Sequence, residues 1–235
     1  MSSGEEDILQ IRGLVVHNYV LLEPDGGVIL LDGGFLGNAL GRIEKTLKIH
    51  DRSLKEDVRA ILLTHGHIDH TLNIAALKRA TGAPVFAPKA DAAHISGTHS
   101  YQGLSRICGL MESFGRMVLK FEPPEIDDWY EPGENLDFWG GLKVIALPGH
   151  TSGHCGLFSE KQNAFFTADS FANFYHRAEM PPPWFNVDGK EARRSIVKAA
   201  ALCDDETRVF PNHCHSGGPD AHRLDLITLA AKLSK

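Results

Sequence analysis

The chain has 235 residues, of which 43% are hydrophobic, and this is enough for one well-packed domain over residues 1–235. A formal net charge of -6 and the lack of a long basic run exclude a broad attraction to nucleic acid or to an anionic membrane. The acidic start has no apolar signal segment, no stretch reaches transmembrane length, and the four cysteines form no CxxC pair. We therefore expect a cytoplasmic protein with free thiols that acts on a small molecule.

The first third of the sequence predicts strands followed by helices. Residues 14–23 and 27–31 are apolar runs on either side of Pro24-Asp25-Gly26, a strong turn signal, and they predict a hairpin. Residues 38–49 carry apolar side chains at helical spacing and predict a helix. The elements that we expect next are a strand, a helix and a short strand at residues 58–63, 72–80 and 83–87.

The rest of the sequence predicts a similar mixture. Residues 89–120 favour helix with glycine interruptions, and the acidic, proline-rich segment 122–134 is typical of a surface connection. Asp188 and Glu191 resemble a capping box at the start of a helix. The other expected elements are strands at residues 142–147, 163–167 and 207–210 and a terminal helix at 221–233.

The segment from His65 to His70 reads His-Gly-His-Ile-Asp-His and places four metal-binding side chains within six residues. Three imidazoles and a carboxylate are costly to bury without partners, and a metal ion is the simplest partner. His65 and His67 are two apart and point the same way on an extended segment, so they can hold one ion together. Asp69 and His70 face elsewhere, which indicates a second, adjacent ion.

Five of the predicted strands end in a residue or cluster that can bind a metal. These are Asp32, the segment from His65 to His70, His150, Asp169 and His213. Loops at strand ends are where functional sites are assembled on a sheet. The sequence therefore predicts that these residues meet at one edge of the fold.

These motifs, in this order, resemble the metallo-β-lactamase superfamily over nearly the whole chain. Its pattern is a strand that ends in Asp, then HxHxDH, then a His, a bridging Asp and a last His. The segment Pro148–His154 is similar to glyoxalase II enzymes, but only a short segment follows His213 where those enzymes carry a helical glutathione-binding extension. Acyl-homoserine-lactone lactonases share the metal set, yet their Tyr after the bridging Asp is Ala172 here.

The resemblance implies an α/β fold, an αββα four-layer sandwich with metals at one sheet edge. It also implies that Asp169 bridges two divalent ions, for which zinc is the first expectation, with iron or manganese also compatible with the ligand types. Asp32 is expected to orient a ligating imidazole. The implied ligands fall into two sets, namely His65, His67 and His150 on one ion and Asp69, His70 and His213 on the other.

This site predicts a dinuclear metal-dependent hydrolase whose metal-bridging hydroxide cleaves an ester, thioester or lactone of a small molecule. Metal binding lowers the pKa of water from 15.7 toward about 7, so no Ser or Cys nucleophile is needed. We expect Asp69 to be the catalytic residue, because its free oxygen can hold the hydroxide or pass its proton to the leaving group. The alternatives are a phosphodiesterase of the same fold, iron-dependent persulfide or oxygen chemistry, and a non-catalytic metal-binding protein.

Two points stay open in the sequence. His215 competes with His213 as the last ligand, because it lies two residues further along and faces the same side of an extended segment. Aromatic residues after the bridging Asp either form an apolar wall over the metals or simply pack against the sheet. The candidate pocket residues in this region are Phe171, Tyr175, His176 and Trp184.

Overall fold

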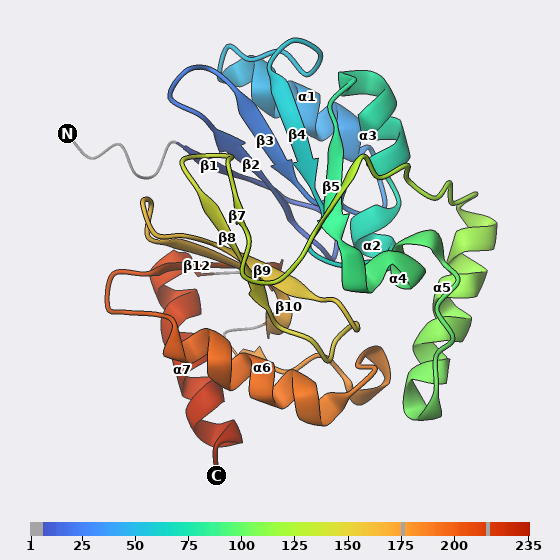
Figure 1. Cartoon of the computed structure of the whole chain (residues 1–235), viewed down its shortest axis with the longest axis vertical. Helices are drawn as coiled ribbons and strands as arrows, with labels where there is room; N and C mark the ends of the chain where they lie inside the picture. Colours follow the sequence, from blue (N-terminus) through green and yellow to red (C-terminus); the bar gives the residue numbers. More distant parts are fainter. Residues whose placement is uncertain (1–6, 175–176, 215–216) are drawn as a thin grey trace.

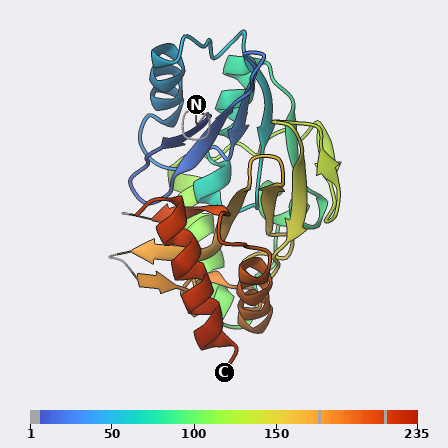
Figure 2. The ribbon, with the colours of Figure 1, turned by 90° about the vertical axis from the view of Figure 1, so that its left-hand side faces the viewer.

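Two β-sheets pack face to face, and helices cover the outer face of each sheet (Figure 1). The computed structural model describes residues 7–174, 177–214 and 217–235. The four layers are also visible after a quarter turn about the vertical axis (Figure 2). The α/β sandwich expected from the sequence is therefore confirmed.

The first sheet has the strand order β1-β2-β3-β4-β5-β6. Its first three strands are antiparallel neighbours, and the pairs β3–β4, β4–β5 and β5–β6 are parallel. The strands are β1 (Ile8–Ile11), β2 (Asn18–Leu22), β3 (Val28–Leu31), β4 (Val58–Leu62), β5 (Val85–Pro88) and β6 (Asp128–Tyr130).

The second sheet has the order β11-β10-β9-β8-β7, and β12 pairs with β10 in parallel. Its strands are β7 (Asn135–Leu136), β8 (Leu142–Ala146), β9 (Cys155–Ser159), β10 (Ala164–Phe174), β11 (Arg177–Glu179) and β12 (Arg208–Cys214).

Helices α1 and α3 cover the first sheet, and α6 and α7 cover the second, while α5 stands to one side (Figure 1). The α-helices are α1 (Ala39–Ile49), α2 (Ile68–Thr71), α3 (Ile74–Thr81), α4 (Ala92–Ser96), α5 (Arg106–Val118), α6 (Gly189–Ala201) and α7 (Pro219–Leu233). Short 3-10 helices are η1 (Lys89–Asp91), η2 (Gly103–Ser105) and η3 (Pro183–Phe185). Among the described residues, no helix is long and apolar enough to cross a membrane.

The alternation of side chains along each strand explains the layers. In β3, Val28 and Leu30 join the core beneath α1 and α3, whereas Ile29 and Leu31 join the core between the sheets. Phe165 in β10 packs toward α6 and α7 in a third core. Both faces of each sheet are thus covered by apolar residues, and the polar residues that remain buried concentrate at one end of the strands.

Several elements differ from those that the sequence predicted. β1, β6, β7, β9 and β11 were not expected, and β6 lies inside the segment 122–134 that was assigned to a surface connection. The expected strand at 163–167 continues to Phe174, so Asp169 lies within β10 and not at its end. The pairing is irregular at Ala168, whose φ of 46° is left-handed, but the strand continues because Ala172 and Asn173 pair with β12 again. His213 likewise lies within β12.

Candidate metal centre

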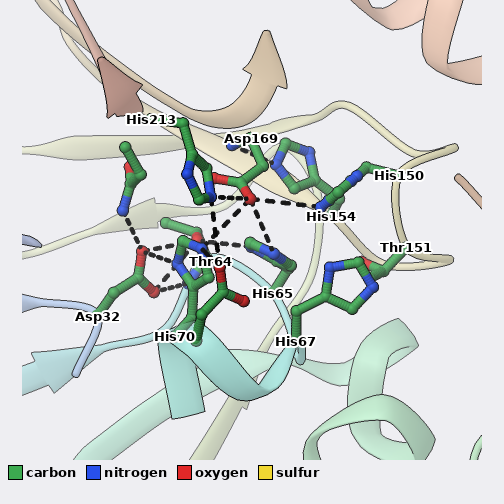
Figure 3. Close-up of polar contacts among 12 residues, drawn as sticks. Asp32, Thr64, His65, His67, His70, His150, Thr151, His154, Asp169 and His213 are labelled. Atoms are coloured by element: carbon green, nitrogen blue, oxygen red, sulfur yellow. Dashed lines mark hydrogen bonds and ion pairs between the residues drawn. The ribbon is translucent and has the colours of Figure 1, made fainter. Parts of the chain in front are cut away.

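The seven side chains that the sequence singled out as ligands meet between the ends of the two sheets (Figure 3). His65 and His67 lie between β4 and α2, and Asp69 and His70 lie on α2. The second sheet contributes the other three, His150 between β8 and β9, Asp169 in β10 and His213 in β12. Their roles as ligands stay a prediction.

The side chains form two adjacent groups, and within each group one candidate ligand atom per residue lies within 4.8 Å of the others. The first group is His65, His67 and His150, and the second is Asp69, His70, Asp169 and His213. This division matches the two ligand sets that the resemblance implied.

Asp169 lies between the two groups. Its Oδ2 is 3.7 Å from Nε2 of His65 and 3.4 Å from Nε2 of His150, both in the first group. The same oxygen is 3.3 Å from Nε2 of His70 and 3.0 Å from Nε2 of His213 in the second group. One buried carboxylate thus faces four imidazole nitrogens, which is the position that a bridging ligand needs.

Several buried polar atoms in this cluster have no hydrogen-bond partner among the described residues. They are Nε2 of His65, His70 and His150 and Oδ1 of Asp169. Such atoms cost free energy unless something else binds them, and imidazole nitrogens with carboxylate oxygens are a donor set that suits zinc, iron or manganese. The residues present therefore fit divalent metal ions.

Asp32, at the end of β3, contacts this cluster from behind. Its Oδ2 lies 3.0 Å from Nδ1 of His70 and accepts from the hydroxyl of Thr64. Its Oδ1 accepts from the backbone N–H of Thr64. A carboxylate can only accept, so Nδ1 of His70 carries a proton, and Nε2, which faces Asp169, is the nitrogen that could bind a metal ion. This is the contact that the sequence predicted for Asp32. Thr64 extends it, because its hydroxyl is also 3.1 Å from Nδ1 of His65.

The other imidazoles are oriented in the same way. Nδ1 of His150 lies 3.3 Å from Oδ1 of Asn186, and Nδ1 of His213 lies 2.8 Å from the carbonyl oxygen of Val15. His154 is 2.9 Å from the carbonyl oxygen of Leu147 through Nδ1, and its Nε2 accepts from the backbone N–H of Asp169. His154 therefore holds the bridging aspartate in place and is itself fully engaged.

The pKa shifts follow from burial and from the carboxylates. Burial lowers the pKa of His65 and His67 well below the usual value, so both are neutral at pH 7. Burial alone would do the same to His213, but Asp169 and Asp69 together raise its pKa to about 10. The pKa of Asp169 is well below its usual value because His213 and His70 outweigh its burial. Without metals, the second group is thus held together by ion pairs.

Two buried carboxylates beside the candidate ligands were not predicted from the sequence. Asp91, three residues after β5, accepts from the backbone N–H of Gly66 at 2.7 Å, from the hydroxyl of Thr151 at 2.7 Å and from the backbone N–H of Gly153 at 2.6 Å. It joins the two loops that carry the three histidines of the first group. Its position after a strand, at the same edge as Asp32, is the signal that could have found it.

Glu112 is the second of these carboxylates. It lies on α5, accepts from the backbone N–H of Ile68 at 2.8 Å and from the hydroxyl of Tyr101 at 2.7 Å, and is buried. Burial raises its pKa. Glu112 fixes the first residue of α2, and nothing in the local sequence around it marks that role.

The family profile of the metallo-beta-lactamase superfamily matches residues 12–213, which contain all seven side chains of the two groups. The chain belongs to the metallo-beta-lactamase superfamily. It is accordingly a metal-dependent hydrolase.

Individual relatives agree with this membership of the metallo-beta-lactamase superfamily. A hydroxyacylglutathione hydrolase from Bdellovibrio bacteriovorus is 30% identical over 171 residues, which are 71% of this chain and 53% of that protein. A probable metallo-hydrolase, YflN, from Bacillus subtilis is 25% identical over 93% of this chain and 83% of its own length.

Solved structures of metallo-beta-lactamase proteins share the fold. The class B3 di-zinc metallo-beta-lactamase LRA-12 from an Alaskan soil metagenome has a TM-score of 0.71 at 20% identity, covering 97% of this chain and 89% of that one. TTHA1623 in a di-iron-bound form has a TM-score of 0.64 at 23% identity, covering 92% and 96%. These likenesses show the fold.

A cavity of about 460 Å³ opens over the two groups of this metallo-beta-lactamase superfamily member. Its walls include Asp69, Asp169 and Phe171, so Phe171 lies where the sequence predicted a pocket residue. Trp184 does not line the cavity; the preceding prolines turn η3 so that Phe185 faces inward and Trp184 is 40% exposed. The predicted pocket residues Tyr175 and His176, and the competing ligand His215, lie outside the described residues.

Proposed function

We propose that this superfamily member hydrolyses an ester, thioester or lactone of a small molecule at a site with two divalent metal ions. The observation that carries the proposal is the position of Asp169, whose single Oδ2 lies within 3.7 Å of imidazole nitrogens from both groups. The relative named as a hydroxyacylglutathione hydrolase supports a thioester or a related acyl compound among the substrates.

The proposed ligands follow the two groups. His65, His67 and His150 would hold one ion, Asp69, His70 and His213 the other, and Asp169 would bind both. The nitrogen-rich donor set favours zinc and also accommodates iron or manganese. Solved structures of this fold have been described in di-zinc and di-iron forms, so metal analysis has to decide between them.

When bound, the ions would supply a water of lowered pKa and would polarise the substrate carbonyl. Asp69 is the residue that faces the reaction: it lines the cavity, and its Oδ2 is 3.3 Å from Nε2 of His213. Burial opposes ionisation of Asp69, yet His70 and His213 hold its pKa below the usual value, so it is a carboxylate at pH 7.

Asp69 would therefore accept a hydrogen bond from the attacking water and hold it toward the acyl carbon. A new C–O bond forms from the water oxygen to that carbon, and the bond to the alcohol or thiol breaks. The proton of the water passes through the Asp69 carboxylate to the departing oxygen or sulfur, which leaves a carboxylic acid and an alcohol or thiol. General acid–base help of this type accelerates reactions roughly 10²- to 10⁴-fold.

The test uses purified protein, metal analysis and a panel of p-nitrophenyl esters, a lactone, an acyl thioester and bis-p-nitrophenyl phosphate. We expect about two metal ions per chain and turnover of at least one acyl compound, with kcat reduced roughly 10²-fold or more in Asp69→Asn. Asp204→Asn, at an exposed carboxylate remote from the site, serves as the control. Loss of turnover in the control as well, or equal activity in Asp69→Asn, would contradict the proposed role of Asp69.

The same panel separates the other readings of the sequence. Turnover of the phosphate diester alone would replace acyl hydrolysis with phosphodiesterase activity. One iron per chain with oxygen consumption on a persulfide would replace it with redox chemistry. A metal-replete protein that turns over none of these compounds would be a binding protein, and the proposal would be wrong.

A further inference from the structure

The walls of the cavity over the candidate metal centre are mainly apolar. Above the histidines and carboxylates, the side chains that face the space include Phe35, Ile68, Met111, Phe171, Pro182 and Phe185. They come from the loop after β3, from α2, α5 and β10, and from the segment around η3. A substrate that reaches the candidate metals must therefore place its non-reacting part against hydrocarbon.

The carboxylates of the walls are not accompanied by lysine or arginine. Asp69, Glu112 and Asp169 line the cavity, and no Lys or Arg is among its described lining residues. Glu112 accepts from the backbone N–H of Ile68 and from Tyr101, and its Oε2 also lies 3.5 Å from a guanidinium nitrogen of Arg116. Arg116 is not among the described lining residues, and its charge is balanced by Glu112. Away from the candidate metal ligands, an anionic substituent in this space would lose its hydration and meet no Lys or Arg among the described lining residues.

Cys108 adds to this uncharged wall. Its Sγ lies 3.8 Å from Nε2 of His67, and it is buried among the lining residues. A buried cysteine of this kind behaves as a small apolar group.

The apolar wall continues outward along α5. Met111 lines the cavity and is also 53% exposed, and Ile107 and Phe114, one helical turn to either side, are exposed apolar residues. An acyl chain longer than the cavity could therefore extend along this row of apolar side chains. Figure 1 shows that α5 stands to one side, away from the body of the two sheets.

We propose that the substrate is an ester, thioester or lactone with an uncharged aliphatic acyl group of medium length, and that anionic acyl or thiol groups are rejected. This inference rests on the proposed hydrolase function and narrows it. It also separates this chain from enzymes for glutathione thioesters, because glutathione carries carboxylates that would face the acidic cavity.

The first experiment compares p-nitrophenyl acetate, p-nitrophenyl octanoate and the mono-p-nitrophenyl ester of suberic acid, which has the octanoate chain with a carboxylate at its end. For the metal-loaded protein we expect kcat/KM for octanoate to exceed that for acetate by about tenfold or more, since each buried methylene favours binding. The suberate monoester should be hydrolysed no better than acetate.

The second experiment changes the wall. Met111→Lys should abolish most of the preference for octanoate and raise kcat/KM for the suberate monoester, because it adds a cation where the chain end would lie. Leu110→Lys places the same charge one residue away, at a side chain that is 73% exposed and does not line the cavity, and should change neither value. Equal effects of the two variants would overturn the inference.

A binding measurement that needs no turnover completes the test. The ketone 2-nonanone carries the same hydrocarbon chain on its carbonyl as the octanoate ester and cannot be hydrolysed, and 8-oxononanoate is the anionic counterpart that matches the suberate monoester. Calorimetry should show tighter binding of the ketone, and Met111→Lys should reverse this order. If the protein hydrolyses p-nitrophenyl acetate but binds the ketone no better than its anionic counterpart, the inferred preference for an uncharged acyl group is wrong, and the hydrolase function stands. If the protein binds the ketone selectively but hydrolyses none of the esters, the proposed hydrolase function is wrong, and the preference of the cavity for an uncharged apolar ligand stands.

Discussion

Three buried aspartates of this site differ in what faces them. Asp169 faces imidazole nitrogens, whereas Asp32 and Asp91 face hydrogen-bond donors of the loops that carry the histidines. A carboxylate that accepts several hydrogen bonds fixes the geometry around it, and its replacement leaves those donors unsatisfied. Asp169 would therefore bind metal, whereas Asp32 and Asp91 would orient the residues that bind it.

Asp91 gives the sharpest prediction at this scale, because it joins both loops of the three-histidine group. In Asp91→Asn, the NH₂ of the new amide would face the N–H and O–H groups that now donate to the carboxylate. Two donors cannot form a hydrogen bond with each other, so the two loops should move apart. We expect the affinity for one of the two metal ions to fall about 10- to 100-fold. Competition with a chelator, followed by the absorption spectrum of the cobalt-substituted protein, measures this loss.

The control for this prediction is Asp204→Asn. Asp204 also accepts several hydrogen bonds, from Thr207, Asn163 and the backbone N–H of Glu206, but it lies on an exposed turn. Its replacement should leave both metal affinities unchanged. If Asp91→Asn binds two ions as tightly as the unaltered chain, the assigned positioning role is wrong.

At the scale of the elements, the close approach of α4 to the loop between β4 and α2 holds the first histidines in place. A Cβ added to Gly66 would lie 2.5 Å from Cβ of His94 and 2.5 Å from the backbone nitrogen of Ile95. No side chain fits there unless the loop or the helix moves. The glycine between His65 and His67 is thus required by packing and not by an unusual φ.

Gly66→Ala should therefore lower the free energy of unfolding by about 2 kcal/mol, in the range of overpacked interiors, and should weaken metal binding. Urea denaturation and a metal titration measure the two effects. Gly189→Ala is the matched control, because its added Cβ meets nothing within 4 Å, and its effect should stay below about 1 kcal/mol. Metal affinity that is unchanged in Gly66→Ala would contradict the packing argument.

The sequence predicted those elements whose pattern is local. The hairpin of β2 and β3, helix α1 and the cap of α6 at Asp188 follow from turn residues, helical spacing and capping side chains. β6 could not be read in this way, because it pairs with β5 across a long segment of chain and only three residues form it. The extension of β10 past Ala168 depends equally on its neighbour β12.

The candidate site was more predictable than the fold around it. A metal ligand must be one of a few residue types, so His65, His67 and His70 are visible in any conformation. The residues that position them are ordinary ones, and Asn186, Asp91 and Glu112 acquire their roles only through contacts between distant segments. Trp184 and Phe185 show the same limit, because only the turn of η3 decides which ring enters the cavity.

At the scale of the whole molecule, the candidate ligands connect the two sheets. The first sheet and its loops supply the segment from His65 to His70, and the second supplies His150, Asp169 and His213. Metal ions bound between them would hold the two halves together. Since ions that bind only the folded chain stabilise it, removal of metal should lower the melting temperature.

The fall in melting temperature on metal removal should depend on pH, because ion pairs hold the metal-free site together. The pKa of His213 is about 10 in the folded chain against an ordinary value of 6.5, and that of His70 is also raised well above it. Their stabilisation is complete below pH 6.5 and is lost as the pH rises through their folded pKa values. His65 and His67, whose pKa values are lowered, are neutral in both states above pH 6.5 and do not oppose this trend.

Metal-free protein should therefore melt at least about 3 °C lower at pH 9 than at pH 7. The metal-loaded protein should show a smaller change, because its imidazoles are already neutral at both values. Calorimetry with and without a chelator measures both, and the gap between the two melting temperatures should widen with pH. In His213→Gln the fall for the metal-free chain should shrink, since one of the two titrating groups is gone. A metal-free melting temperature that rises between pH 7 and pH 9 would contradict the ion-paired site from which the expectation derives.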